Sequence, residues 1–132
     1  MESLTYIASL IMVALGTLHL IYALYDLFIH PRYFKPADKA LLAAMRKTRP
    51  AISPHARDYW LAVVGFNISH AMGVLLFGLL IVLSAEPQNA LLRPVVPLIA
   101  LGYTLLSWRC WFFIPTIGAA LTTILLALAW YL

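Results

Sequence analysis

Four polar side chains interrupt the long apolar runs of this sequence, and they are its first candidates for chemistry. His19 and Asp26 lie in the first run, and Asn67 and His70 lie in the second. An ionisable group in hydrocarbon is costly, so such residues mark ligand sites, proton paths or structural hydrogen bonds. An imidazole can ligate a metal or act as a general acid or base near neutral pH, and an amide such as that of Asn67 can orient it.

The two histidines are expected at the same depth, on two antiparallel helices. With helix boundaries at Ile29 and Tyr59, His19 lies ten residues from its boundary and His70 eleven. At a rise of ~1.5 Å per residue, both imidazoles lie about 15 to 16 Å inside the membrane. We therefore expect both histidines near the middle of the bilayer, at matched depth on the two helices.

This pair has three interpretations, which the residues alone leave open. Gly16 and Gly73 each lie three residues from a histidine, on the side away from the cytoplasmic helix boundary. A slot left by these glycines between the helices would bind an apolar or lipid-like ligand. Alternatively, the imidazoles would be the axial ligands of a b-type haem. A zinc site is not expected, because two histidines lack the third and fourth ligands that zinc requires. As a third interpretation, the polar side chains would hydrogen-bond across closely packed helices. The predicted ligand-binding residues are His19, Tyr22, Asn67, His70, Gly16 and Gly73.

Asp26 continues a polar stripe towards the end of the first helix. His19, Tyr22 and Asp26 are spaced i, i+3 and i+7, which places them on one helical face that could relay protons or line a cavity. Because Asp26 is close to the membrane boundary, we expect it to form an interface ion pair with Arg109 or with a lysine of the following loop.

The composition excludes a soluble globular protein. Of the 132 residues, 64% are hydrophobic and 11% are charged, against roughly half and a quarter in soluble domains. The chain has one cysteine, which excludes an internal disulfide framework. It also lacks the common hydrolase, metalloprotease and phosphate-loop motifs, so whether it is an enzyme stays open. Catalysis would depend on His19 or His70 as an acid or base.

Apolar runs separated by prolines and charges predict a single all-α membrane domain, an up-down bundle of four transmembrane helices. The only substantial loop, residues 30–58, carries seven of the nine Lys and Arg residues. Within it, residues 36–47 predict a short amphipathic helix on the membrane surface, against anionic lipid headgroups. The four spans are expected at about residues 3–29, 59–84, 91–108 and 115–132.

The distribution of basic residues also predicts orientation. By the positive-inside rule, the 30–58 loop and the turn at Arg109 face the cytoplasm, and both termini lie on the other side. Since eight of the nine Lys and Arg residues, all except Arg93, lie in segments at one membrane face, no nucleic-acid partner is expected. The expected partners are membrane lipids, a second copy of the chain or a larger membrane complex, and the expected location is the bacterial cytoplasmic membrane.

Three segments, GTLHLIY, GFNISHAMGVLLFG and RCWFFIP, together resemble an uncharacterised family of small bacterial four-helix integral membrane proteins. The resemblance extends over most of the chain. It implies the four-helix fold and no particular activity, cofactor or substrate. Cys110 departs from the pattern, because an aromatic residue is expected after Arg109. The resemblance directs attention to His19, Asn67, His70, Gly73, Gly78, Arg109, Trp111 and Pro115.

Taken together, these features favour a small non-enzymatic membrane protein. It would be an accessory subunit or the binder of an apolar ligand in a pocket around His19, Asn67 and His70. The alternative hypothesis is a redox protein with haem bound by the two histidines, or a membrane enzyme that uses them as acid and base.

Overall fold

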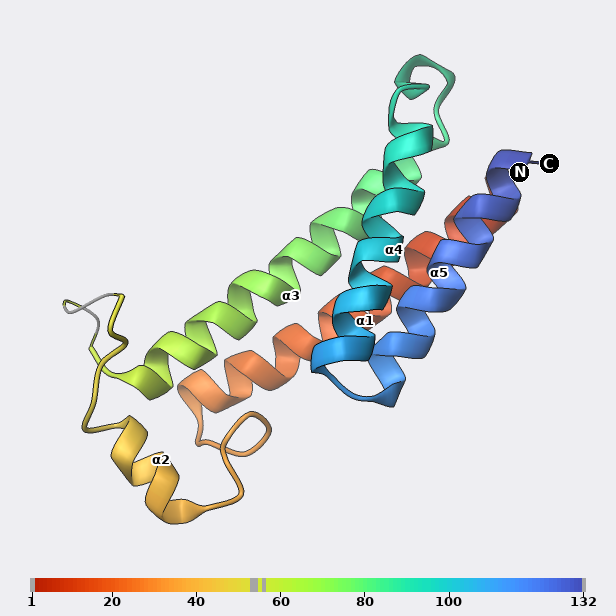
Figure 1. Ribbon diagram of the computed structural model, residues 1–132. Coiled ribbons are helices and arrows are strands. Elements are labelled where there is room, and N and C mark those ends of the chain that lie inside the picture. The colour runs from red at the N-terminus through yellow and green to blue at the C-terminus, as the bar shows by residue number, and fades with distance from the viewer. Residues whose placement is uncertain (1, 53–54, 56, 132) are drawn as a thin grey trace. The chain divides into compact units, whose positions relative to one another are not determined.

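The computed structural model of the protein describes residues 2–52, 55 and 57–131, and over these residues all regular secondary structure is helical, without a strand (Figure 1). The all-α prediction is therefore confirmed. Five α-helices and one short 3-10 helix follow one another: α1 (Glu2–Phe28), α2 (Lys39–Met45), α3 (Tyr59–Ser84), η1 (Pro87–Asn89), α4 (Leu92–Cys110) and α5 (Phe113–Tyr131).

The helix boundaries follow local signals in the sequence. α1 ends at Phe28, just before the His30-Pro31 pair, since proline cannot continue the backbone hydrogen-bond ladder. α3 begins at Tyr59 after Asp58, whose carboxylate accepts the amide hydrogen of Leu61 at 2.8 Å. This is an N-terminal cap that satisfies one of the free amides of the first turn.

The amphipathic loop helix is shorter than the residues 36–47 expected from the sequence. α2 begins at Lys39, because Asp38 adopts an extended backbone and its side chain caps the helix by accepting from the Ala40 amide at 2.8 Å. Arg46 forms the other cap. Aspartate competes for nearby backbone amides and so favours the cap over the helix interior, which accounts for the difference.

Three of the described helices, α1, α3 and α5, are long and apolar enough to cross a membrane. α4 is not among them, although it was expected to be a span, because Arg93, two prolines and Arg109 lower its apolarity. Pro97 lies inside α4 and removes one backbone hydrogen bond. The structure thus gives three candidate spans and a fourth helix of 19 residues.

The chain divides into two compact units, which are described separately. The first, Met1–Gly16 with Gly73–Leu132, is called the four-helix unit, and the second, Thr17–Met72, the loop unit. In the four-helix unit, one cavity is lined by the start of α1, the end of α3, the start of α4 and the end of α5. Successive helical segments of this unit therefore run antiparallel.

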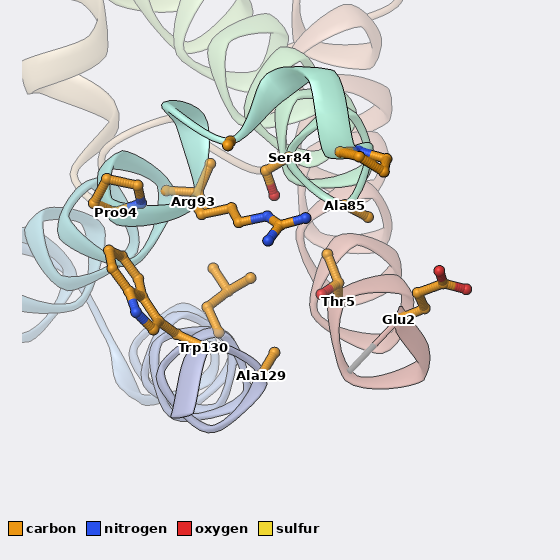
Figure 2. A pocket seen from close by; sticks show the side chains of 12 residues that line it. Glu2, Thr5, Ser84, Ala85, Arg93, Pro94, Ala129 and Trp130 are labelled. Atoms are coloured by element: carbon orange, nitrogen blue, oxygen red, sulfur yellow. The ribbon is translucent and has the colours of Figure 1, made fainter. Parts of the chain in front are cut away.

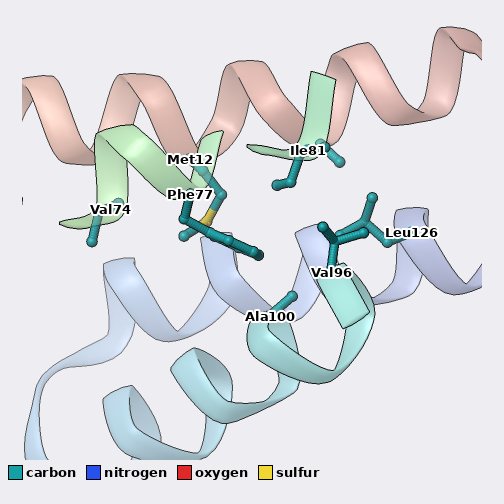
Figure 3. Packing of buried hydrophobic residues seen from close by; sticks show 8 residues of the cluster. Met12, Val74, Phe77, Ile81, Val96, Ala100 and Leu126 are labelled. Carbon is teal, nitrogen blue, oxygen red and sulfur yellow. The ribbon is translucent and has the colours of Figure 1, made fainter. Parts of the chain in front are cut away.

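The core of the four-helix unit takes residues from each of its helical segments (Figure 3). Phe77 and Ile81 of α3 lie at its centre, and Phe77 also contacts the ring of Tyr103 of α4, with ring centroids 5.5 Å apart. Thr104 of α4 and Thr123 of α5 have their hydroxyl oxygens 3.1 Å apart. The buried cluster is Ala8, Met12, Val74, Phe77, Ile81, Val96, Ala100 and Leu126.

Close packing of α1 on α3 depends on glycine. A Cβ added to Gly78 would lie 2.6 Å from Cγ2 of Val13 and 3.2 Å from the Val13 backbone nitrogen. At the same level, the buried hydroxyl of Ser9 donates a hydrogen bond of 2.7 Å to the Gly78 carbonyl oxygen. Small residues let helix backbones approach in this way, and polar contacts then become possible between them.

Candidate functional site

The loop unit brings together His19, Asn67 and His70 from α1 and α3. Nε2 of His19 lies 3.0 Å from the amide oxygen of Asn67, and because that oxygen can only accept, the imidazole is the donor. Nδ2 of Asn67 donates to the Val63 carbonyl oxygen one turn earlier, at 2.9 Å, which fixes the orientation of the amide. The structure thus brings together three of the residues predicted to bind a ligand, and the binding itself stays a prediction.

The two imidazoles contact each other directly. Their ring centroids are 5.4 Å apart, and the rings are inclined by 66°, so that one ring presents its edge to the other. Both side chains are half-buried. Two helices thus supply two imidazoles and a fixed amide within one small polar cluster, which we call the histidine cluster (His19, Asn67 and His70).

An aromatic residue of the loop covers the cluster. The Phe34 ring lies on His19, with ring centroids 4.9 Å apart and planes inclined by 36°. Phe34 is only six residues beyond the end of α1, so the chain must turn back sharply along that helix. Figure 1 shows this return as the tight loop that follows α1.

The carboxylate of Asp26 fixes the returning loop. Oδ1 accepts the amide hydrogens of Arg32 at 2.8 Å and Tyr33 at 2.9 Å, and Oδ2 accepts that of Phe34 at 2.8 Å. Asp26 is 3% exposed. A buried carboxylate needs such donors, because each unpaired oxygen would lose its hydration without compensation. The bonds hold the Phe34 segment against α1.

Two tyrosines of α1 strengthen the same contact. The ring of Tyr22 stacks on that of Tyr33, with centroids 4.2 Å apart and planes at 14°, and Tyr25 meets Tyr33 edge to face at 5.4 Å. Tyr22 was predicted to line the ligand site, and the structure places it beside the loop that covers the cluster. Tyr22 and Asp26, two of the three residues of the predicted polar stripe, therefore hold the loop against α1.

The two glycines predicted to line the ligand site, Gly16 and Gly73, belong to the four-helix unit. A Cβ at Gly16 would lie 3.0 Å from the Leu75 backbone nitrogen, so this glycine serves close helix packing and leaves no open slot beside it. A Cβ at Gly73 would lie 3.7 Å from the Tyr103 hydroxyl, which is ordinary contact.

Arg109 lies in the last turn of α4 and its side chain is exposed. Sequence reasoning paired Asp26 with this charge, whereas the contacts of Asp26 within the loop unit are with backbone amides. The ion pair with Arg109 stays a prediction.

The histidine cluster does not fit a haem. Two axial imidazoles point at the iron from opposite faces of the porphyrin, which lies between them. Here the rings touch edge to face, and Nε2 of His19 is engaged by Asn67. Among the described residues, no group of three or more His, Cys, Asp or Glu side chains could hold a metal ion. The arrangement instead offers hydrogen-bonding groups next to aromatic and apolar surface.

Sequence reasoning missed Tyr33 and Phe34. The signals that could have found them are two adjacent aromatic residues soon after a helix-ending proline, and a carboxylate near the helix end. Comparison with known proteins finds no match among family models, curated protein sequences or solved structures.

Proposed function

We propose that the protein is a four-span integral protein of the bacterial cytoplasmic membrane, with α4 as the additional span. α4 has 19 residues, or about 28 Å of helix, which approaches the thickness of the hydrocarbon core. Its arginines are the second residue and the second to last, where long side chains can reach the headgroups. Val96, Ala100 and Ser107 are buried, as expected of a helix packed within a bundle.

The positively charged segments support the orientation. Residues 30–58 carry most of the basic residues, and Arg109 adds another between α4 and α5. With these segments in the cytoplasm, the start of α1 and the end of α5 lie on the other side. α2 then lies along the cytoplasmic membrane surface, where the side chain of Lys39 meets anionic headgroups.

The function that the site supports best is non-enzymatic binding of a lipid-like ligand with a hydrogen-bonding head. The observation that carries this proposal is the histidine cluster beneath Phe34: two imidazoles and an oriented amide, from facing helices, under an aromatic side chain. Small-molecule sites combine apolar and aromatic walls with a few placed polar groups. The polar groups would hold the head, and the aromatic residues would contact the apolar part.

The other interpretations have less support. Haem does not fit the imidazole geometry. Acid–base catalysis stays the alternative, in which His19 or His70 would act on a lipid-soluble substrate. A role as accessory subunit or as one member of a homo-oligomer is compatible with ligand binding, since either would add contacts on the outer helix faces.

Analysis of molecules that co-purify in mild detergent tests the proposal. Asn67→Ala and His70→Ala remove parts of the cluster, and Ser69→Ala is the matched control, because Ser69 is exposed on the same helix and its hydroxyl donates to the Phe66 carbonyl of its own turn. Mass spectrometry of organic extracts should show one class of lipid-like molecule in stoichiometric amount in the wild type and in Ser69→Ala. The two cluster variants should retain severalfold less.

Equal lipid content in all four proteins would contradict the proposal and leave the cluster as a packing feature. Absorption spectra of the wild type, His19→Ala and His70→Ala add a second check. A haem band that disappears in His19→Ala and in His70→Ala would show that the redox interpretation is right and the proposal wrong.

A further inference from the structure

A second candidate site lies in the four-helix unit and shares no residue with the histidine cluster. Here a cavity of about 310 Å³ opens between the first turns of α1 and α4 and the last turns of α3 and α5 (Figure 2). This volume is at the lower end of the range for small-molecule sites, about 300 to 1,000 Å³. It can hold a charged head and the adjoining carbons, but not a whole lipid.

Arg93 gives the cavity its chemistry. It is the second residue of α4, and Figure 2 shows its guanidinium extending across the cavity towards the side of Ser84 and Thr5. In the part of the chain that the structure describes, Arg93 makes no ion pair. A guanidinium presents a planar fork of donors that matches two oxygens of a phosphate, so the cavity offers a ready ligand for an anionic head.

The other polar groups at the cavity leave this role to Arg93. The Ser84 hydroxyl donates to the Ile81 carbonyl oxygen of its own helix at 2.6 Å, so its hydrogen is already used. Glu2 lines the rim, and Figure 2 shows its carboxylate directed away from the guanidinium. Glu2 therefore weakens the attraction for an anion without occupying the arginine.

The opposite wall is apolar. Val96 and Leu126 are buried, and the Trp130 indole, which is half exposed, stands beside them. Tryptophan is enriched where membrane helices meet the headgroups, because one end of its ring system is apolar and the other is polar. A cation next to such a wall suits a molecule that is charged at one end and apolar at the other.

We propose that this cavity binds the phosphate head of an anionic phospholipid, with Arg93 as the phosphate ligand and Trp130 and Leu126 against the first carbons of the lipid. In the topology proposed above, the cavity lies on the non-cytoplasmic side, at the level of the lipid headgroups. The site depends on the membrane embedding of the protein and is independent of any ligand of the histidine cluster.

Native mass spectrometry of the detergent-solubilised protein tests the site with three probes. Dioleoyl phosphatidylglycerol has both head and tails, dioleoylglycerol has the tails alone, and inorganic phosphate has the charge alone. The wild type should retain the phospholipid in preference to the other two. Competition by inorganic phosphate as strong as by the phospholipid would overturn the amphiphile assignment, and so would equal retention of dioleoylglycerol.

Substitutions locate the binding. Arg93→Gln should weaken phosphatidylglycerol binding about tenfold, the effect expected for loss of hydrogen bonds to a charged group. Arg93→Lys, which keeps the charge and loses the fork, should be intermediate, and it preserves the test if Arg93→Gln does not fold. Glu2→Gln should strengthen binding, because it removes the only carboxylate among the residues that line this cavity.

Arg57→Gln is the matched control, since Arg57 is an exposed arginine in the segment before α3. It removes the same charge from a different part of the chain and should leave binding of the retained lipid unchanged. Equal weakening by Arg57→Gln and Arg93→Gln would mean that only net charge attracts the lipid, and it would overturn the proposal. Unchanged binding in a folded Arg93→Gln protein would also overturn it.

Discussion

Nε2 of His19 lies 3.0 Å from Oδ1 of Asn67, across two helices and 48 residues of sequence. The bond is part-buried and joins side chains that both lie within candidate membrane spans. Water competes weakly for such a bond, yet interhelical hydrogen bonds in membrane proteins contribute only modestly on average. We therefore expect this hydrogen bond to contribute only modestly to stability.

A double-mutant cycle measures the strength of the pair. For His19→Ala, Asn67→Ala and the double variant, we expect a coupling free energy of about 0.6 kcal/mol, the average for interhelical hydrogen bonds. Reversible unfolding in mixed detergent micelles provides the free energies of unfolding. A coupling of several kcal/mol would show that the cluster is chiefly a structural element, and a coupling of zero would show that the bond does not form.

Asp26 should be essential for the returning loop. Asp26→Ala removes the acceptor of the amides of Arg32, Tyr33 and Phe34, and hydrogen bonds to a charged group are worth about 1.5 to 3 kcal/mol each. Asp26→Asn should fall between the wild type and Asp26→Ala, because its side chain offers one acceptor oxygen. Hydrogen exchange should show lost protection at these three amides.

Asp38→Asn is the control for that measurement. Asp38 caps α2 by one exposed bond, and asparagine caps helices about as well as aspartate. The free energy of unfolding should therefore hardly change. Protection at the amides of residues 32–34 that survives Asp26→Ala would contradict the role of the carboxylate.

Two glycines of α3 should respond in opposite ways to the same substitution. Gly78→Ala places a Cβ 2.6 Å from Val13, whose branched side chain has little freedom, and should destabilise the protein by about 1 to 3 kcal/mol. Gly65→Ala meets nothing within 4 Å, and it should stabilise the helix by up to about 1 kcal/mol. Thermal unfolding in detergent compares the two. Equal effects would mean that α1 and α3 do not pack closely at Gly78.

The single cysteine gives a direct test of whether α4 crosses the membrane. Cys110 is exposed at the end of α4, so a membrane-impermeant maleimide should label it only after the cytoplasmic side is opened. Gln88→Cys, made together with Cys110→Ser, places the thiol before α4 and should be labelled in intact spheroplasts. Labelling of both thiols from the same side would mean that α4 does not span.

The helices were predictable because their signals are local. α3 occupies Tyr59–Ser84, as expected from an apolar run that follows Asp58, and α1 ends where His30-Pro31 requires. Counting residues from the expected helix boundaries also placed His19 and His70 at matching depth, and their rings lie in contact. When two antiparallel helices begin and end at known residues, the residues that lie at the same depth on the two helices are largely determined.

The return of the loop was not predictable, because its contacts involve backbone. Asp26 was expected to pair with a charged side chain, because charged side chains can be read from the sequence. Which backbone amides lie near a carboxylate cannot be read from it. The bound amides of Arg32, Tyr33 and Phe34 carry no signature of their own residue types. The position of Phe34 over His19 follows from those bonds, so it could not be predicted from the sequence either. Gly16 was expected beside a slot, but the closeness of Leu75 depends on helix rotation, which apolar runs do not specify.

Photocrosslinking at Phe34 tests the central claim, ligand binding at the histidine cluster, most directly. Phe34 is replaced by the photoreactive residue p-benzoylphenylalanine, and Phe28, whose side chain is 77% exposed at the end of α1, is replaced in a parallel control. After irradiation in native membranes, the Phe34 position should give an adduct of one discrete lipid-like mass, whereas the Phe28 position should give the mixture of bulk lipids. The same bulk mixture at both positions, or no small-molecule adduct at Phe34, would contradict ligand binding at the cluster.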